Sequence, residues 1–202
     1  MLGVPYFFCI YLKESQVTEL QAINRMLALA GEPPVNTLTT TIPEVLQALE
    51  VLSVVSSEVQ ATGWHFNTDT KYELPLYQDM TIPVPGNALR VDATDQKLDL
   101  VVRAGKLYDK TTHSFQFEAP VEVDIVWGFP FDDLPPTVQH YVALRASRRF
   151  LREHLGASSA DVQLANDEQA AFMRMQDSDG VNADYNMLEG NPETLRAALR
   201  EL

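Results

Sequence analysis

The chain has 202 residues, of which 46% are apolar and 21% are charged, and it carries a net charge of −13. This length allows one domain with a proper core, or at most two small ones. The 28 acidic residues outnumber the 15 basic ones, which disfavours binding to duplex DNA or to anionic lipids because both rely on Lys and Arg. The single cysteine, Cys9, excludes an internal disulfide and fits a reducing compartment.

The apolar run Val4–Leu12 is the first feature of the chain. It is too short to cross a bilayer, which takes about 20 apolar residues. No basic residue precedes it and no clear cleavage site follows it, so a signal peptide is not predicted either. We expect an N-terminal strand or an extended arm that packs on this chain or on a neighbouring one.

Two helices are predicted before residue 64. Apolar residues recur at helical spacing over Thr18–Ala30, where Thr18 and Gln21 form a capping box at the start. The second helix is expected to begin at Pro43, a favoured first-turn residue, and to end at Gly63. About a dozen residues join the two helices, so they can pack antiparallel.

Helical periodicity disappears between residues 64 and 127, where short β-like segments are separated by Pro and Gly. Leu98–Arg103 and Lys106–Tyr108 flank Ala104-Gly105, which predicts a tight hairpin. Val121 to Ile125 alternates apolar and acidic residues, as a half-buried strand does. Weaker strand candidates are Lys71–Leu76, Met80–Val84 and Ala88–Val91.

Helical signals return after Pro135-Pro136. One helix is predicted over Thr137–Leu155 and another from about Ser158 to Gln176. The acidic stretch Asp177–Asp184 contains a glycine and is expected to be a loop. A last helix is predicted over Pro192–Leu202.

These elements predict an α+β fold in which both ends of the chain contribute to one helical bundle. Residues 1–63 and 134–202 would form the bundle. Residues 64–133 would form an inserted region with a small antiparallel sheet.

No catalytic, metal or cofactor motif is present. The four histidines lack the spacing of metal ligands, the glycines are scattered singly, and there is no nucleophile elbow. We therefore expect neither a metal nor a cofactor. Asp132 and Asp133 are the most suggestive carboxylate pair, but acidic residues just before a helix also oppose its dipole favourably, and this structural role is favoured.

Four arginines lie within eight positions of the predicted helix Thr137–Leu155, and their spacing places them along one broad face. Three interpretations remain open: a solvated face with internal ion pairs, a contact with an acidic neighbouring subunit, or a surface that faces DNA. The second is attractive because the segment after Gly156 is acidic, and the net charge opposes the third. The candidate subunit-interface residues are Arg145, Arg148, Arg149 and Arg152.

Five sequence fragments occur in an order and spacing that resemble tail tubular protein A of short-tailed phages. The resemblance covers the chain from about Thr18 to Leu188, and the apolar start departs from it. No single fragment is specific, whereas the five in order are. They are Gly31-Glu32-Pro33-Pro34-Val35, Gly63-Trp64-x-Phe66-Asn67, Arg103-x-Gly105-x-x-Tyr108-Asp109, Leu134-Pro135 leading to Ala146-Ser147-Arg148-x-Phe150, and Tyr185-Asn186-Met187-Leu188.

The resemblance implies a virion protein of the phage tail without enzymatic activity. It implies a twelvefold ring that joins the portal to the nozzle (tail tubular protein B), gives attachment sites to tail fibres and lets genomic double-stranded DNA pass through its centre. An acidic lumen would let DNA slide without specific binding, and a single-cysteine chain suits assembly in the host bacterial cytoplasm.

Two other classes are considered beside this one. A tail-associated polysaccharide hydrolase would use Asp124, Asp132 or Asp133, because glycoside hydrolysis takes a pair of carboxyl groups. A non-viral assembly or binding module would lack portal and nozzle genes as genomic neighbours.

Overall fold

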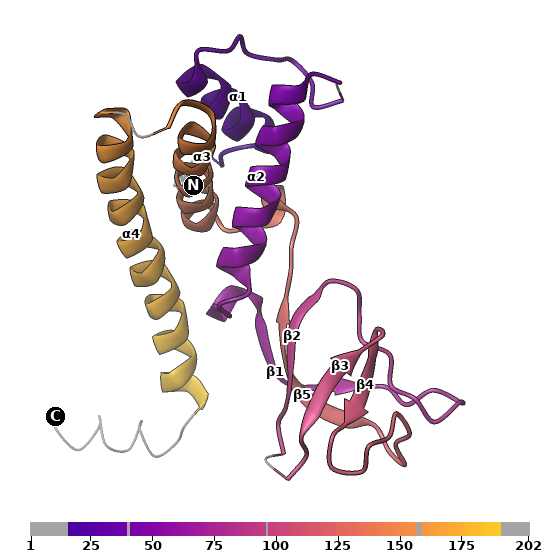
Figure 1. Cartoon of the computed structure of the whole chain (residues 1–202). Helices are drawn as coiled ribbons and strands as arrows, with labels where there is room; N and C mark the ends of the chain where they lie inside the picture. The colour runs from indigo at the N-terminus through magenta and orange to yellow at the C-terminus, as the bar shows by residue number, and fades with distance from the viewer. Residues whose placement is uncertain (1–15, 40, 96, 157–158, 191–202) are drawn as a thin grey trace, which may run out of the picture.

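The computed structural model describes residues 16–39, 41–95, 97–156 and 159–190. In chain order, two helices come first, a β-rich region follows and two further helices come last. In space the four helices lie together and the strands lie at one end of them (Figure 1). The predicted mixed α+β class is confirmed. The apolar run Val4–Leu12 and the helix predicted over Pro192–Leu202 lie outside the described residues.

The first two helices are α1 (Glu19–Ala30) and α2 (Pro43–Gln60). The predicted capping box is present. The Thr18 hydroxyl accepts a hydrogen bond from the Gln21 backbone N–H, and the Gln21 side chain accepts one from the Thr18 backbone N–H. These two bonds satisfy backbone donors that a helix start otherwise leaves free.

Two longer helices follow the β-rich region, α3 (Pro136–Leu155) and α4 (Ser159–Gly190). The loop predicted over Asp177–Asp184 is wrong, because α4 continues through it. An exposed glycine inside a helix costs only about 1 kcal/mol. The backbone N–H of His65 donates to both carboxylate oxygens of Asp179, at 2.9 and 3.2 Å. This contact holds that part of α4 against the segment that follows α2.

Replacing Gly180 with alanine is expected to raise the free energy of unfolding by about 0.5–1 kcal/mol. A Cβ at this exposed site would meet no atom within 4 Å, so only the backbone entropy of the unfolded chain changes. Gly31→Ala is the matched control: its Cβ is equally unobstructed, but Gly31 has φ +81° and alanine is strained there. Urea unfolding should show a higher free energy of unfolding for Gly180→Ala and a lower one for Gly31→Ala. A loss of stability in Gly180→Ala would contradict this account.

A buried apolar cluster joins the four helices. It includes Ile23 of α1, Leu52 of α2, Phe150 of α3 and Leu164 of α4. α3 contacts each of the other three helices and so lies at the centre of this part (Figure 1).

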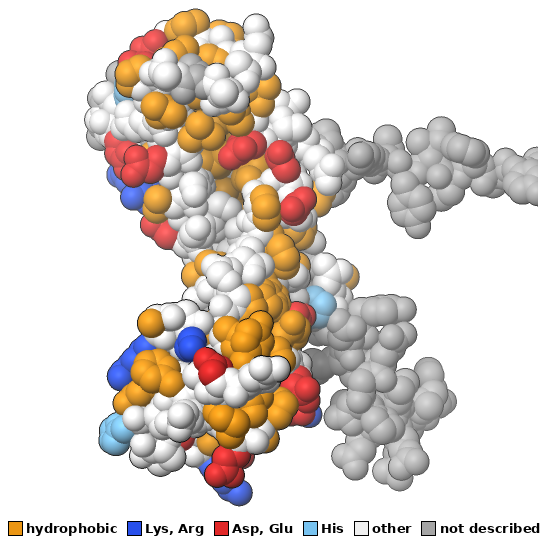
Figure 2. All heavy atoms as spheres, turned by 90° about the vertical axis from the view of Figure 1, so that its right-hand side faces the viewer, with side chains coloured by type: hydrophobic (Ala, Val, Ile, Leu, Met, Phe, Trp, Pro, Cys, Tyr) orange, Lys and Arg blue, Asp and Glu red, His pale blue; other side chains and the backbone are white. Residues whose placement is uncertain are grey.

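The β-rich region has its own buried cluster under a three-stranded antiparallel sheet of order β1-β5-β2. Its strands are β1 (Thr68–Leu74), β2 (Ala88–Ala93) and β5 (Val121–Trp127). The alternation predicted for β5 is confirmed, because Val121, Val123 and Ile125 are buried. Figure 2 shows a narrower waist between the helical and the β-rich parts.

The predicted hairpin is also present, as β3 (Leu100–Arg103) and β4 (Lys106–Asp109). Ala104 and Gly105 both have positive φ, which the tight turn requires. The strand predicted over Met80–Val84 is wrong: within the described chain, the segment's strand-like pairing is limited to an isolated bridge between Pro83 and Lys106. Pro83 within it lacks the N–H that a ladder needs.

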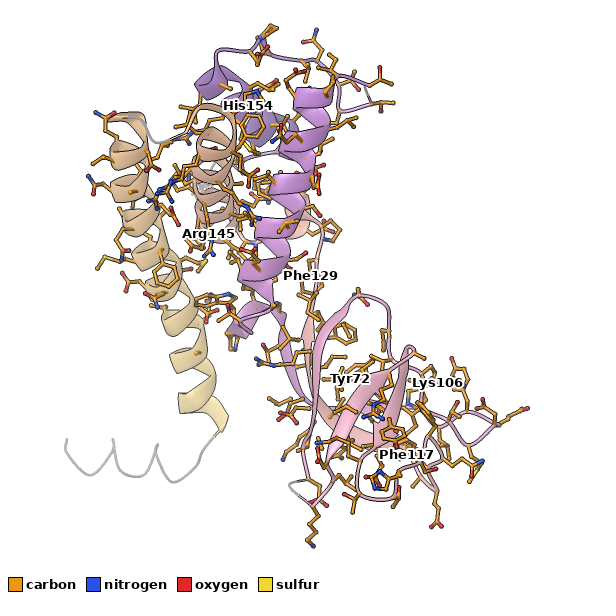
Figure 3. The ribbon with its side chains drawn as sticks, in the orientation of Figure 1. Tyr72, Lys106, Phe117, Phe129, Arg145 and His154 are labelled. Carbon is orange, nitrogen blue, oxygen red and sulfur yellow. The ribbon has the colours of Figure 1, made fainter. Side chains whose placement is uncertain are left out.

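Two buried amides join the helical part to the sheet. The side chain of Gln60 donates to the Phe129 carbonyl oxygen at 3.0 Å and accepts from the Phe129 N–H at 2.7 Å. The side-chain amide of Asn67 donates to the carbonyl oxygens of Gln60 and Trp127, at 2.9 and 2.8 Å. Phe129 is labelled in Figure 3 between α2 and the strands. These bonds tie the end of α2 to the segment that leads from β5 to α3.

A charged interhelical cleft as the candidate functional site

The four candidate arginines lie on α3, where their spacing places them along the side that faces α2 and α4. We call Arg145, Arg148, Arg149 and Arg152 the arginine cluster. Together with Glu58, Glu153 and Glu168 they line an open cleft of about 510 Å³. The structure thus brings all four predicted residues to one surface.

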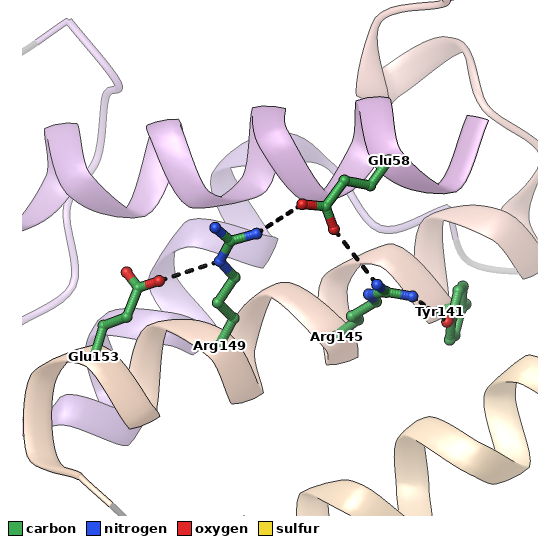
Figure 4. Close-up of polar contacts among 5 residues, drawn as sticks. All are labelled: Glu58, Tyr141, Arg145, Arg149 and Glu153. Atoms are coloured by element: carbon green, nitrogen blue, oxygen red, sulfur yellow. Dashed lines mark hydrogen bonds and ion pairs between the residues drawn. The ribbon is translucent and has the colours of Figure 1, made fainter. Parts of the chain in front are cut away.

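On the α2 side of the cleft, Glu58 bridges two arginines (Figure 4). Its carboxylate oxygens lie 3.4 Å from Arg145 Nη2 and 3.0 Å from Arg149 Nη1. Arg149 also pairs with Glu153 one turn along α3, at 3.1 Å, and Arg145 donates to the Tyr141 hydroxyl at 3.0 Å. The hydrogen bonds to Glu153 and Glu58 raise the pKa of Arg149. All these charged groups are about two-fifths exposed, so each pair adds little stability.

On the α4 side the pairs are better covered. Arg148 donates from Nε to Asp161 at 2.8 Å and from Nη1 to Glu168 at 2.9 Å. Arg152 approaches the other oxygen of Asp161 at 3.3 Å. The Asp161 side chain is only 12% exposed, and its hydrogen bond is the main reason that the pKa of Arg148 is raised. These pairs hold the first half of α4 against α3.

The charges of the cleft balance. The arginine cluster meets four carboxylates, and every arginine in it has a partner within the chain. A neutralised surface offers phosphates little attraction, so the geometry favours internal ion pairs over a surface that faces DNA. Two acids after Gly156, Asp161 and Glu168, contact these arginines within the same molecule. The role of the cluster at a subunit interface stays a prediction.

Replacing Arg148 with methionine is expected to lower the free energy of unfolding by about 2 kcal/mol. The change keeps the apolar stem but leaves Asp161 and Glu168 partly buried without this counter-charge, and partial exposure reduces the cost below that of a fully buried pair. Arg152→Met is the control, because its side chain is 55% exposed and Asp161 keeps Arg148. Urea unfolding of both variants checks this, and equal effects would contradict the ranking.

Two of the three carboxylates considered for hydrolysis, Asp124 and Asp132, have structural partners. Asp132 accepts a hydrogen bond from the Glu19 N–H at 2.8 Å, at the start of α1. Asp124 accepts from the Lys71 N–H at 3.0 Å and from the Thr94 hydroxyl at 3.1 Å, in the sheet. Asp133 is exposed in a short 3-10 helix, Phe131–Asp133. Asp124 and Asp132 thus belong to different parts of the fold, and each accepts a hydrogen bond from a backbone N–H next to it in space.

The described residues contain no group of three His, Cys, Asp or Glu side chains that could hold a metal ion. No helix among them is long and apolar enough to cross a membrane.

Comparison with known proteins decides the family. Residues 20–185, which run from the first turn of α1 through the β-rich region and into α4, match the family described as tail tubular protein. The chain belongs to the tail tubular protein family. It is similar to tail tubular protein A of Klebsiella phage KP34, with 32% identity over 141 residues, which is 70% of this chain and 75% of that protein. The resemblance read from the sequence is confirmed.

Membership of the tail tubular protein family makes the chain a structural component of a phage tail. No comparison supports the polysaccharide hydrolase alternative.

Sequence reasoning missed the partners of the arginine cluster and the amides of the junction. Glu58 lies 87 positions before Arg145, so no local pattern connects the two. Gln60 and Asn67 flank Gly63-Trp64, and the fragment Gly63-Trp64-x-Phe66-Asn67 was the only signal that marked this place.

Proposed function

We propose that this tail tubular protein forms a ring, twelvefold as the resemblance implies, that joins the phage portal to the tail nozzle. The ring would be built in the host cytoplasm, carry attachment sites for tail fibres and surround the double-stranded DNA as it leaves the head. The observation that carries the proposal is the family match over residues 20–185, together with the likeness to a tail tubular protein A.

The charge supports a channel through which DNA slides. The net charge is −13, and the arginine cluster is neutralised by carboxylates. A wall of this kind repels phosphates and does not bind them.

We also propose that residues 1–63 and 134–202 form one folding unit, a helical bundle, and that residues 64–133 form an inserted β-rich unit. Two separate buried clusters support this division: one contains Ile23, Leu52 and Phe150, and the other contains Leu107 and Ile125.

Electron microscopy of the purified protein, alone and mixed with the portal ring of the same phage, tests the adaptor role. We expect rings with an open channel that stack on the portal. A monomer that ignores the portal would overturn the proposal.

The same assay tests the arginine cluster as a subunit contact. We propose that its exposed members, Arg149 and Arg152, also meet a neighbouring copy in the ring. Their side chains are 42% and 55% exposed in the single chain, which leaves donors available. Arg149→Glu with Arg152→Glu should then weaken ring assembly, whereas Lys71→Glu with Lys97→Glu, an equal change of charge in the β-rich region, should not. Intact rings in the arginine variant would count against the contact.

A further inference from the structure

A second cleft, with different lining residues from the first, lies where α1, α3 and α4 meet. Arg25 of α1, His140 of α3 and Arg174 of α4 come together there, around a space of about 220 Å³ that Leu144, Asp167 and Ala170 also line. Three helices therefore each place one basic side chain at one site.

Arg25 and Arg174 differ from the arginine cluster in their pairing, although Asp167 lines the same cleft. Neither forms an ion pair with any residue in the described parts of the chain, whereas Arg145, Arg148, Arg149 and Arg152 are all paired. Arg90 and Arg103 in the β-rich region also form no ion pair with a described residue, but each has another partner: Arg90 donates to the Thr62 carbonyl oxygen at 3.5 Å, and Arg103 lies over the Tyr108 ring.

Both arginines act on His140. Burial lowers the pKa of this imidazole, and the positive charges of Arg25 and Arg174 lower it further, while Asp167 opposes them. These are the charged groups that face His140 from α1 and α4. The cleft therefore holds an excess of positive charge that the described chain does not neutralise, and an oxyanion bound between the arginines would relieve it.

We propose that the cleft between Arg25, His140 and Arg174 is an oxyanion-binding site that receives an acidic side chain from a second copy of the chain. This proposal rests on the ring proposed above, because only an assembly brings a second copy to the site.

The size and setting of the cleft favour a carboxylate over DNA. A space of about 220 Å³ is smaller than the roughly 300–1,000 Å³ of sites for drug-sized ligands, and it suits a single carboxylate group. DNA binding draws its strength from many phosphate contacts made together, and the arginine cluster, being neutralised, cannot extend this site into a track. Acidic side chains, in contrast, are abundant on a second copy.

The first experiment tests the oxyanion site in the free protein. The imidazole of His140 is titrated by NMR in chloride and then in acetate at constant ionic strength. Acetate should raise the pKa of His140 in the wild type and not in Arg25→Gln with Arg174→Gln, because a bound carboxylate stabilises the charged imidazole. The exposed His113 serves as the internal reference and should not respond. An unchanged pKa of His140 in acetate would overturn the site.

The second experiment tests the source of the carboxylate. Mass photometry measures assembly of the wild type, of Arg25→Gln with Arg174→Gln, and of Lys71→Gln with Lys97→Gln, a control with the same change of charge in the β-rich region. The site variant should raise the concentration needed for assembly about tenfold or more, and the control should leave it unchanged. Equal assembly of all three proteins would overturn the contribution of a second copy. The wild type could form no rings while His140 still responds to acetate. That result would support the oxyanion site, but it would overturn both the adaptor ring and the second copy as the source of the carboxylate.

Discussion

Replacing Phe150 with alanine is expected to lower the free energy of unfolding by about 3–5 kcal/mol. The Phe150 ring is fully buried on α3 and belongs to the cluster that joins the four helices. It also stacks on His154, with ring centroids 5.0 Å apart and planes 21° from parallel; Figure 3 places His154 at the end of α3 far from the sheet. Alanine would leave a cavity that three neighbouring helices cannot close without moving.

Urea unfolding followed by circular dichroism measures this loss. Tyr77→Ala is the control, because that ring is 58% exposed and its removal should change stability by no more than about 0.5 kcal/mol. A loss below about 1 kcal/mol in Phe150→Ala would mean that the helices repack around the site, and that this cluster is not the rigid core of the bundle.

The same substitution bears on the proposed division into two units. Trp64 packs on the helical cluster and Trp127 on the cluster of the sheet. Each indole can be followed alone after the other is replaced by phenylalanine. If the two parts are separate folding units, Phe150→Ala should shift the transition seen by Trp64 more than the one seen by Trp127. Equal shifts would mean that the chain unfolds as one cooperative unit.

Sequence signals that act over a few residues predicted their elements well. The capping box of Thr18 and Gln21, the turn at Ala104-Gly105 and the alternation from Val121 to Ile125 all specify local geometry directly. Each depends on contacts between near neighbours in the chain, and tertiary packing only has to agree with it.

The prediction from sequence failed where tertiary contacts determine the secondary structure. Asp177–Asp184 is polar and contains Gly180, which favours a loop when it is considered alone. In the folded chain, Asp179 accepts hydrogen bonds from the backbone N–H of His65, 114 positions earlier, and α4 continues through the stretch. The anchor lies too far away for any local pattern to reveal it.

The candidate site also combines a local feature that the sequence predicted with tertiary contacts that it did not. The spacing of the arginine cluster correctly placed Arg145, Arg148, Arg149 and Arg152 along one side of a helix. What that side meets depends on how α2 and α4 pack on α3. The acids that neutralise it therefore became visible only in the structure, as did the cleft that Arg25 and Arg174 share.

Replacing Asn67 with alanine is expected to lower the free energy of unfolding by about 3 kcal/mol. Asn67 is 1% exposed, and its side chain makes three hydrogen bonds: it accepts from the Trp64 N–H at 2.8 Å and donates to the carbonyl oxygens of Gln60 and Trp127. Each buried group left without a partner costs about 1–3 kcal/mol. The three losses would fall together at the point where α2, β1 and the end of β5 meet.

Urea unfolding of Asn67→Ala is compared with that of Asn166→Ala, which removes an exposed amide from α4 and should change stability by no more than about 0.5 kcal/mol. Asn67→Asp separates the roles of the side chain: it can still accept from Trp64 but cannot donate to either carbonyl. If the two donated bonds carry the junction, the aspartate variant should be at least as unstable as the alanine variant. A near-native aspartate variant would show instead that the contact with Trp64 alone holds the helical part and the sheet together.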